Sequence, residues 1–265
     1  MAGTLRKSLI ILLSILFLTG MAGLLRSVAA YQQGDEAYAA AMALAGVQES
    51  LDPAVPEEVS PQESLAVPPL EPPSGAAPLS GVDVAALQAV NPDVIGWIEI
   101  PDTGLSYPLV QGADNDYYLS HTWQNTRSAV GSIFMDFRSS ADLSDFNTIL
   151  YGHNMNNGTM FGYLHQFQDP AFLAAHPCLY IADDEGNSRT YRIFAVYEVR
   201  VSTAESYVLS FADTAEKQAF LDACLALSAM DTGVVPTVED RIVTLSTCTG
   251  RGHTSRWVVQ AVLEG

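Results

Sequence analysis

Eight short apolar runs in the C-terminal part of the chain constrain its fold more than any other feature. They are rich in β-branched and aromatic residues and are bounded by turn residues, a pattern typical of β-strands. The runs are 94–100, 105–110, 130–135, 148–151, 178–182, 191–201, 242–247 and 257–263. Eight such runs joined by short loops predict a closed or nearly closed β-barrel, so the expected fold class is mainly β.

Helical patterns interrupt these runs at 82–90, 160–167, 170–175 and 213–230. Asp83 is suited to cap the first of them, and Asn91-Pro92 is suited to end it. In the last and longest pattern, apolar residues recur at intervals of three and four, as on the buried face of a helix. The sequence therefore predicts a barrel with a few helices, including a long helix before the penultimate strand.

The first 30 residues predict a membrane anchor. Residues 8–25 contain no charged side chain and follow Arg6-Lys7. At about 1.5 Å per residue, a run of this length suits a hydrocarbon core of about 30 Å. The basic pair favours a cytoplasmic N-terminus, which leaves the rest of the chain outside the cell. The alternative is a cleaved signal peptide, since Val28-Ala29-Ala30 resembles a cleavage site.

Residues 31–80 are expected to form a juxtamembrane segment and a Pro/Glu-rich spacer, followed by a catalytic domain at 81–265. Strong helix formers at 35–48 predict a short helix. Residues 51–80 hold eight of the fourteen prolines of the chain and no aromatic residue. Such a segment buries too little apolar surface to offset the entropy of ordering, so it is expected to be extended and solvated.

The net charge of −18 argues against nucleic acid as a partner, because nucleic acid requires a basic surface. Acidic clusters at 114–116 and 183–185 lack the spacing of a calcium loop, and solvated turns are the simpler interpretation. A zinc site built from Cys248, His253 and His153 lacks paired-ligand spacing. No metal and no cofactor is therefore predicted.

The three cysteines differ in their surroundings. Their odd number in an exported chain leaves at least one without an intramolecular disulfide. Cys178 and Cys224 lie in apolar patterns, where cysteine usually acts as a small buried hydrophobe. Cys248 follows polar residues and precedes a glycine-containing loop. The local sequence alone agrees about equally well with a structural role and with a nucleophilic role for Cys248.

A nucleophilic cysteine requires a proton carrier and a donor where negative charge develops. His153 follows the run at 148–151 through a glycine, and Arg256 directly precedes the last run. Guanidinium stays charged and presents a planar fork of donors. Arg251 is a rival donor, and we interpret it as an exposed loop residue. The hypothesis is that Cys248, His153 and Arg256 meet at one end of the sheet.

Four separated motifs, together with Thr-Leu-Ser-Thr-Cys at 244–248, give the chain a family resemblance. They read Pro-Leu-Val-Gln-Gly at 108–112, Gly-Ser-Ile-Phe-Met-Asp-Phe-Arg at 131–138, Asn-Thr-Ile-Leu-Tyr-Gly-His-Asn at 147–154 and Thr-Met-Phe at 159–161. With these motifs in this order, roughly residues 81–265 resemble the class B sortases, which are membrane-anchored cysteine transpeptidases of Gram-positive bacteria. The resemblance implies a sortase-like barrel in which the long helix is the class B insertion.

The same resemblance implies roles for individual residues. Cys248 would be the nucleophile, His153 the proton carrier and Arg256 the electrostatic donor. The substrate-binding positions it implies are Asn115, Leu119, Thr203, Tyr207, Val208 and Ser246. For Leu119 and Val208, simple core packing is an equal alternative. The loop after Cys248 is shorter than in the best-known class B pattern, and Thr249 stands where an acidic residue is common.

The resemblance also implies the reaction and its partners. An extracellular enzyme would cleave a sorting signal of the Asn-Pro-x-Thr type after threonine and pass the thioacyl group to an amine acceptor. That acceptor would be a cell-wall precursor amine or, as in pilus-polymerising sortases, a pilin lysine. The membrane would be contacted through the N-terminal helix. The alternatives are a cysteine protease that releases its substrate to water and an inactive surface-binding module.

Overall fold

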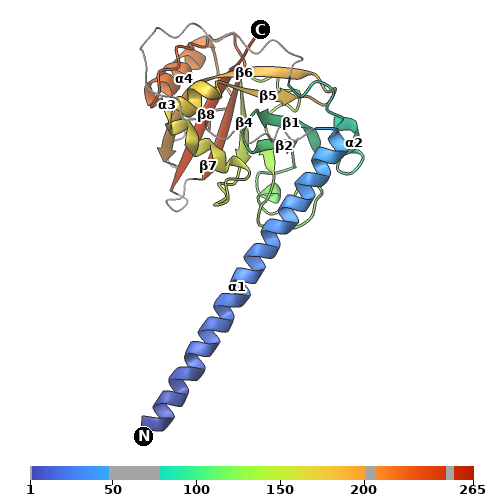
Figure 1. The fold of residues 1–265 in the computed structure, drawn as a ribbon. Coiled ribbons are helices and arrows are strands. Elements are labelled where there is room, and N and C mark those ends of the chain that lie inside the picture. Colours follow the sequence, from blue (N-terminus) through green and yellow to red (C-terminus); the bar gives the residue numbers. More distant parts are fainter. Residues whose placement is uncertain (1, 48–77, 201–206, 249–253) are drawn as a thin grey trace, which may run out of the picture.

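The structure is a computed structural model that describes residues 2–47, 78–200, 207–248 and 254–265. Its strands are β1 (Val94–Ile100), β2 (Leu105–Val110), β3 (Ile133–Met135), β4 (Asn147–Gly152), β5 (Cys178–Ala182), β6 (Ser188–Arg200), β7 (Ile242–Cys248) and β8 (Ser255–Leu263). They close into a barrel in the order β1-β2-β3-β4-β7-β8-β6-β5 (Figure 1). Neighbouring strands are antiparallel except for the pairs β2–β3 and β4–β7. The predicted barrel is confirmed.

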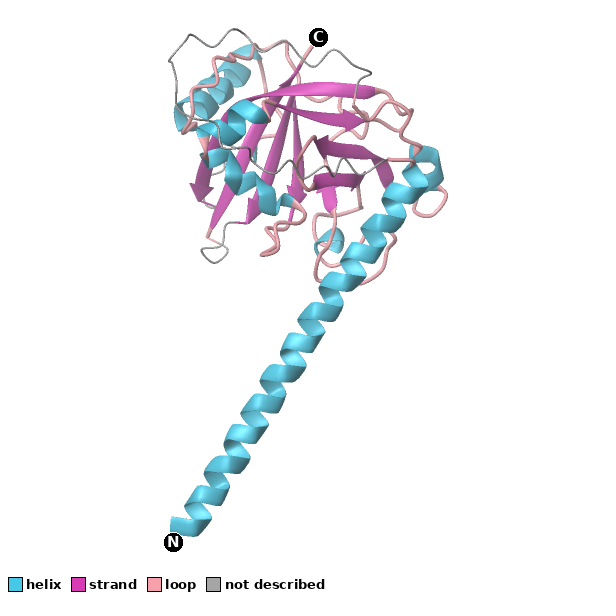
Figure 2. Ribbon diagram, viewed as in Figure 1, coloured by secondary structure: helices cyan, strands magenta, loops and turns pink. Residues whose placement is uncertain are grey.

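The helices are α1 (Ala2–Ala45), α2 (Val84–Gln88), η1 (Tyr117–Leu119), η2 (Phe161–Gln168), α3 (Pro170–Ala175) and α4 (Thr214–Leu227). Figure 2 shows η2, α3 and α4 on one side of the barrel and α1 with α2 on the opposite side. Asp83 caps α2 as predicted, since its carboxylate accepts from the Ala86 amide at 2.9 Å. The long helix α4 precedes the penultimate strand β7, as the sequence predicts.

Several element boundaries differ from the prediction, and two of these differences have a local cause. The strand expected from residue 130 begins at Ile133, because Gly131 adopts a φ of 64° that breaks the extended backbone. The helix expected over 160–167 is the 3₁₀ helix η2, which begins after Met160, whose φ is 55°.

Two apolar clusters hold the fold together. The larger one fills the barrel and includes Trp97, Trp123 and Phe161, all fully buried. The smaller one lies between α4 and the sheet formed by β6, β7 and β8, with Phe220 and Val258 among its members. Burial of apolar surface on both faces fixes the strands that carry the candidate site, since it contributes about 25 cal/mol per Å².

α1 continues through the predicted anchor and the predicted juxtamembrane helix without a break. Its last turns pack on the barrel, where Tyr38 and Ala41 are buried in the main core. The indole N–H of Trp123 also donates to the carbonyl of Ala37 at 2.7 Å. Residues of the predicted juxtamembrane segment, among them Tyr38 and Ala41, thus also contribute to the core of the barrel.

Within the part of the chain that the structure describes, no helix combines the length and the apolar character needed to cross a membrane. The anchor over residues 1–30 stays a prediction from sequence, as does the start of the catalytic domain at residue 81.

Candidate active site

The backbone brings the three predicted catalytic positions to one end of the barrel. β4 runs parallel to β7, with Gly152 opposite Thr247, so the two strands end together. β7 is antiparallel to β8, with Cys248 opposite Arg256. His153 follows Gly152 directly. The side chain of Cys248, and the following residues through 253, lie outside the described part of the structure.

His153 is half-buried, and its ring is held by a backbone oxygen. Its Nε2 lies 2.7 Å from the carbonyl oxygen of Leu119, at the end of η1. Because a carbonyl oxygen only accepts, Nε2 carries a hydrogen and Nδ1 is the acceptor in the neutral ring. A Cβ on Gly131 would come within 3.0 Å of Cδ2 of His153, so this ring position requires glycine there.

Arg256 is half-buried at the start of β8, and a guanidinium nitrogen donates to the carbonyl of Ser255 at 3.3 Å. The guanidinium forms no ion pair with any residue that the structure describes. Since arginine stays charged in proteins, this position supplies a positive charge at the end of β7. The rival Arg251 lies outside the described residues.

The predicted substrate-binding residues form two groups, here called walls. The first wall, with Asn115 and Leu119, is held by the buried carboxylate of Asp136. Asn115 donates to Oδ2 of Asp136 at 2.9 Å and accepts from the amide of Phe137 at 3.0 Å. Arg138 also donates to Asp136, and the hydroxyl of Tyr151 donates to it at 3.1 Å. Burial alone raises the pKa of Asp136, but the bonds from Arg138 and Asn115 outweigh it and hold the pKa at about 2.

The second wall, with Tyr207 and Val208, contacts β7 and β4. The hydroxyls of Tyr207 and Ser246 lie 2.9 Å apart, and the carbonyl of Val208 accepts from Asn147 at 2.8 Å. Val208 also packs against the smaller apolar cluster, so the packing alternative holds for it in part. Leu119, in contrast, is 40% exposed beside His153. Thr203 lies outside the described residues.

Comparison with known proteins identifies the family. The sortase domain model matches residues 98–264, more than half of the chain. The chain belongs to the sortase family. Over 164 residues it is 41% identical to sortase B of Listeria monocytogenes, a segment that covers 61% of this chain. The same segment covers 65% of that relative, so this sortase spans slightly under two thirds of its length.

Two solved structures extend the comparison. The Staphylococcus aureus sortase B–substrate complex has 33% identity and a TM-score of 0.65, covering 68% of this chain and 84% of its own. Sortase B of Bacillus anthracis in complex with AAEK1 has 31% identity and a TM-score of 0.70, covering 89% of this chain and 98% of its own. The predicted class B resemblance is confirmed.

A buried polar ladder joins the strands that carry the candidate site, several residues before the strands reach it, and the sequence analysis missed it. Thr244 donates to Asn147 at 2.7 Å, Gln260 donates to Thr244 at 3.0 Å, and Tyr197 donates to Gln260 at 3.0 Å. The ladder crosses β4, β7, β8 and β6. Because each buried polar group here has a partner, the ladder fixes the relative positions of the strands without an unmet hydrogen bond.

Asp136 was also missed. Its only sequence signal is its place inside the motif at 131–138, since an isolated aspartate after an apolar run usually lies in a solvated turn. The buried positions of Cys178 and Cys224 are as predicted, and burial raises the pKa of the Cys178 thiol. No three His, Cys, Asp or Glu side chains gather as a metal site in the described ranges of this sortase.

Proposed function

We propose that this chain is an extracellular cysteine transpeptidase that cleaves a sorting signal after threonine and passes the protein to an amine of the cell wall. The observation that supports the proposal best is that β4 and β7 end where β8 begins. It brings the backbones of His153, Cys248 and Arg256 together at one end of the barrel.

In the proposed reaction, the Cys248 thiolate attacks the carbonyl carbon of the sorting-motif threonine. The C–N bond of the scissile peptide breaks and a thioester forms. His153 gives the leaving amine its proton and later takes one from the incoming amine. The ring is suited to this exchange because its Nε2 is held by the carbonyl of Leu119 while Nδ1 stays available.

Arg256 serves as the electrostatic donor in this scheme. Negative charge develops on the oxygen of the attacked carbonyl, and a fixed guanidinium stabilises that charge more in the transition state than in the ground state. The lack of an ion pair to Arg256 among the described residues leaves its charge for this use.

The sorting signal would bind between the two walls. Exposed Leu119 offers apolar contact to one side of the signal, and Tyr207 with Ser246 forms the other side. A sortase B from Staphylococcus aureus has been solved as a substrate complex, which supports a peptide substrate for the same fold. By analogy with the family, the motif would be of the Asn-Pro-x-Thr type.

The enzyme would act outside the cell, held at the membrane through residues 1–30. This part of the proposal depends on the uncharged run at 8–25 and on Arg6-Lys7 alone. It predicts that full-length protein fractionates with membranes and keeps its N-terminus. Mature protein in the medium that begins at Tyr31 would instead identify a cleaved signal peptide.

Incubation with an Asn-Pro-x-Thr peptide tests the activity. A thioester adduct detected by mass spectrometry, with product joined to an added amine, is the expected result. Cleavage with release to water only would identify a protease, and transfer only to a pilin lysine would identify a pilus-polymerising enzyme. A peptide that binds but is never cleaved would identify an inactive binding module.

A further inference from the structure

One face of the last turns of α1 is in close contact with the barrel. Its buried residues recur at the spacing of one side of a helix, and they are Gly34, Ala37, Tyr38, Ala41 and Ala45. The glycine lets the backbone approach, since a Cβ there would come within 2.8 Å of Cγ2 of Val130. α1 therefore lies directly against the chain segment that precedes Gly131, the glycine beneath the ring of His153.

Tyr38 makes a buried polar contact from this face. It is 7% exposed, its hydroxyl donates to the carbonyl of Gly131 at 2.5 Å, and its oxygen lies 3.3 Å from Oγ of Ser132. The ring packs edge-on against Tyr107, with centroids 5.0 Å apart. Burial raises the pKa of Tyr38, so the hydroxyl keeps its hydrogen and remains a donor.

Ser132 holds the segment that fixes the ring of His153. The amide of Ser132 donates to the carbonyl of Tyr118 at 2.9 Å, and its hydroxyl donates to the carbonyl of His121 at 2.8 Å. Leu119 lies between these two acceptors in the chain, and its own carbonyl lies 2.7 Å from Nε2 of the catalytic ring. The acceptor of that ring is thus held on both sides by a serine that α1 contacts.

The backbone of His153 is supported from the same helix by a second route. The hydroxyl of Tyr107, on which the ring of Tyr38 packs, accepts from the amide of Met160 at 3.2 Å. The next amide, that of Phe161, donates to the carbonyl of His153 at 3.0 Å. One tyrosine of α1 therefore stands behind both the ring and the backbone of the histidine.

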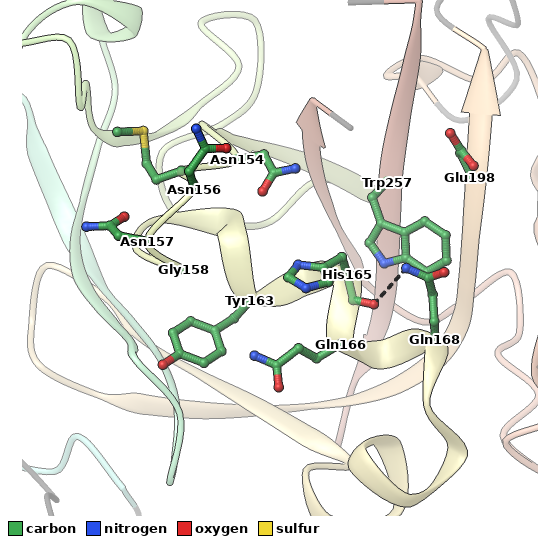
Figure 3. A pocket seen from close by; sticks show the side chains of 11 residues that line it. Asn154, Asn156, Asn157, Gly158, Tyr163, His165, Gln166, Gln168, Glu198 and Trp257 are labelled. Atoms are coloured by element: carbon green, nitrogen blue, oxygen red, sulfur yellow. Dashed lines mark hydrogen bonds between the residues drawn. The ribbon is translucent and has the colours of Figure 1, made fainter. Parts of the chain in front are cut away.

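The loop between His153 and Met160 is open on its other side. Residues 154–158 line a cleft of about 630 Å³, and Figure 3 shows Asn154 and Asn156 along one side of it. A loop that faces an open cleft is not packed on that side, so its position depends on the contacts at its ends. Support from α1 consequently matters more here than it would in a fully packed segment.

We propose that Tyr38 is a positioning residue for the reaction, which holds the carbonyl of Leu119, and through it the ring of His153, in the place where the ring exchanges protons with the substrate amine. The inference depends on the proposed transpeptidase function and adds to it a part for the helix that precedes the barrel. Proton transfer depends steeply on the distance between ring and amine, so a loosened ring slows turnover without weakening peptide binding.

Tyr38→Phe in the full-length chain tests the proposal, because it removes the hydroxyl and keeps the ring on Tyr107. Cleavage of an Asn-Pro-x-Thr peptide should show a kcat/KM lowered about three- to tenfold, the effect of one neutral hydrogen bond. The affinity for the peptide, measured in the Cys248→Ala background, should not change, since neither wall is altered. The contact between Trp123 and Ala37 remains to keep α1 docked, and circular dichroism checks the fold.

Tyr31→Phe is the matched control. It makes the same chemical change on the same helix, and the Tyr31 hydroxyl has no hydrogen bond to any residue that the structure describes. It should leave the kcat/KM and the peptide affinity at their wild-type values.

The Nε2–H proton of His153 gives a readout that a purely structural contribution of Tyr38 would leave unchanged. Its bond to the carbonyl of Leu119 should slow its exchange with water, which proton NMR measures. The exchange should be about three- to tenfold faster in Tyr38→Phe, if one neutral hydrogen bond is lost behind that carbonyl. In Tyr31→Phe it should match wild type.

Three results would overturn the inference: a wild-type kcat/KM in Tyr38→Phe, a lowered kcat/KM with unchanged exchange of the ring proton, or a loss of rate matched by a loss of peptide affinity. A wild-type ring proton that exchanges as fast as in free histidine would overturn it as well. The NMR measurement needs no turnover. Failure of wild type to cleave the peptide is therefore seen separately, and it would overturn the proposed function itself.

Discussion

The sheet end and the walls of the candidate site are held by different means. At the sheet end, backbone ladders fix the strands, and the polar ladder from Asn147 to Tyr197 joins the same strands farther from the site. The walls are held by single side chains, such as Asn115 on one side and Tyr207 on the other. If the proposed function holds, the difference means that the chemistry depends on the rigid sheet, whereas recognition of the peptide depends on walls that one substitution can loosen.

Cys248→Ala tests the sheet end with the largest expected effect. Loss of the nucleophile should abolish both cleavage and thioester formation, since no second group can hold the acyl chain. Mass spectrometry of the trapped adduct, followed by peptide mapping, measures it. Cys178→Ala and Cys224→Ala are the controls, because both thiols are buried away from the site. An adduct on either of these would contradict the assignment.

Arg256→Ala should lower kcat/KM by about 10²–10³-fold, the usual cost of one oxyanion donor. Arg256→Lys should recover only part of the rate, because a point charge does not reproduce the planar fork. Steady-state cleavage of the sorting peptide measures both, with circular dichroism to check folding. If Arg256→Ala keeps the wild-type kcat/KM, the oxyanion donor must be a residue other than Arg256.

Asp136→Asn tests the wall through stability. The folded pKa of Asp136, about 2, is lower than its ordinary value of 3.8. A lowered pKa stabilises the fold above about pH 4, and this stabilisation is lost as the pH falls toward 2. Because Arg138 is exposed and screened, we expect the variant to lose about 1–2 kcal/mol at pH 7.

Urea unfolding of wild type and Asp136→Asn at pH 7 and pH 3 measures this difference. The gap in the free energy of unfolding should be smaller at pH 3 than at pH 7. An equal gap at both values would show that the carboxylate charge does not hold this wall. Asp184→Asn is a suitable control, since Asp184 is an exposed aspartate in a surface turn.

Tyr207→Phe should have the smallest effect. It removes the contact between the Tyr207 hydroxyl and Ser246 but keeps the ring packed on the smaller apolar cluster. A neutral hydrogen bond is worth about 0.5–1.5 kcal/mol, so the KM for the sorting peptide should rise by less than about tenfold. A large fall in kcat with unchanged KM would place Tyr207 with the chemistry and break the division between sheet and walls.

The sequence predicts much of the barrel because its signals are local. Each apolar run and its turn residues describe one strand, and four of the eight observed strands begin at the predicted residue. The positions of His153 and Arg256 at strand ends follow from the same signals. The parallel pairing of β4 with β7 does not, because it joins segments about 90 residues apart in the chain.

The missed features have non-local causes. The burial of Asp136 depends on Arg138, Asn115 and Tyr151, and no spacing rule connects the last two with it. The packing of Tyr38 on the barrel was not predicted, because the alanine-rich residues around it have the pattern of an ordinary helix.

The docking of α1 fixes the distance between the barrel and the first turn of the helix. Between Ala2 and Ala37 the helix rises about 52 Å, at about 1.5 Å per residue. A continuous helix of this length is stiff, in contrast to the extended spacer predicted for residues 51–80. The proline-rich segment at 51–80 follows the turns of α1 that pack on the barrel. Its length therefore does not affect the distance between the barrel and the first turn of α1. The first turn of α1 therefore lies at a fixed distance from the barrel, and the helix leaves the barrel in one fixed direction.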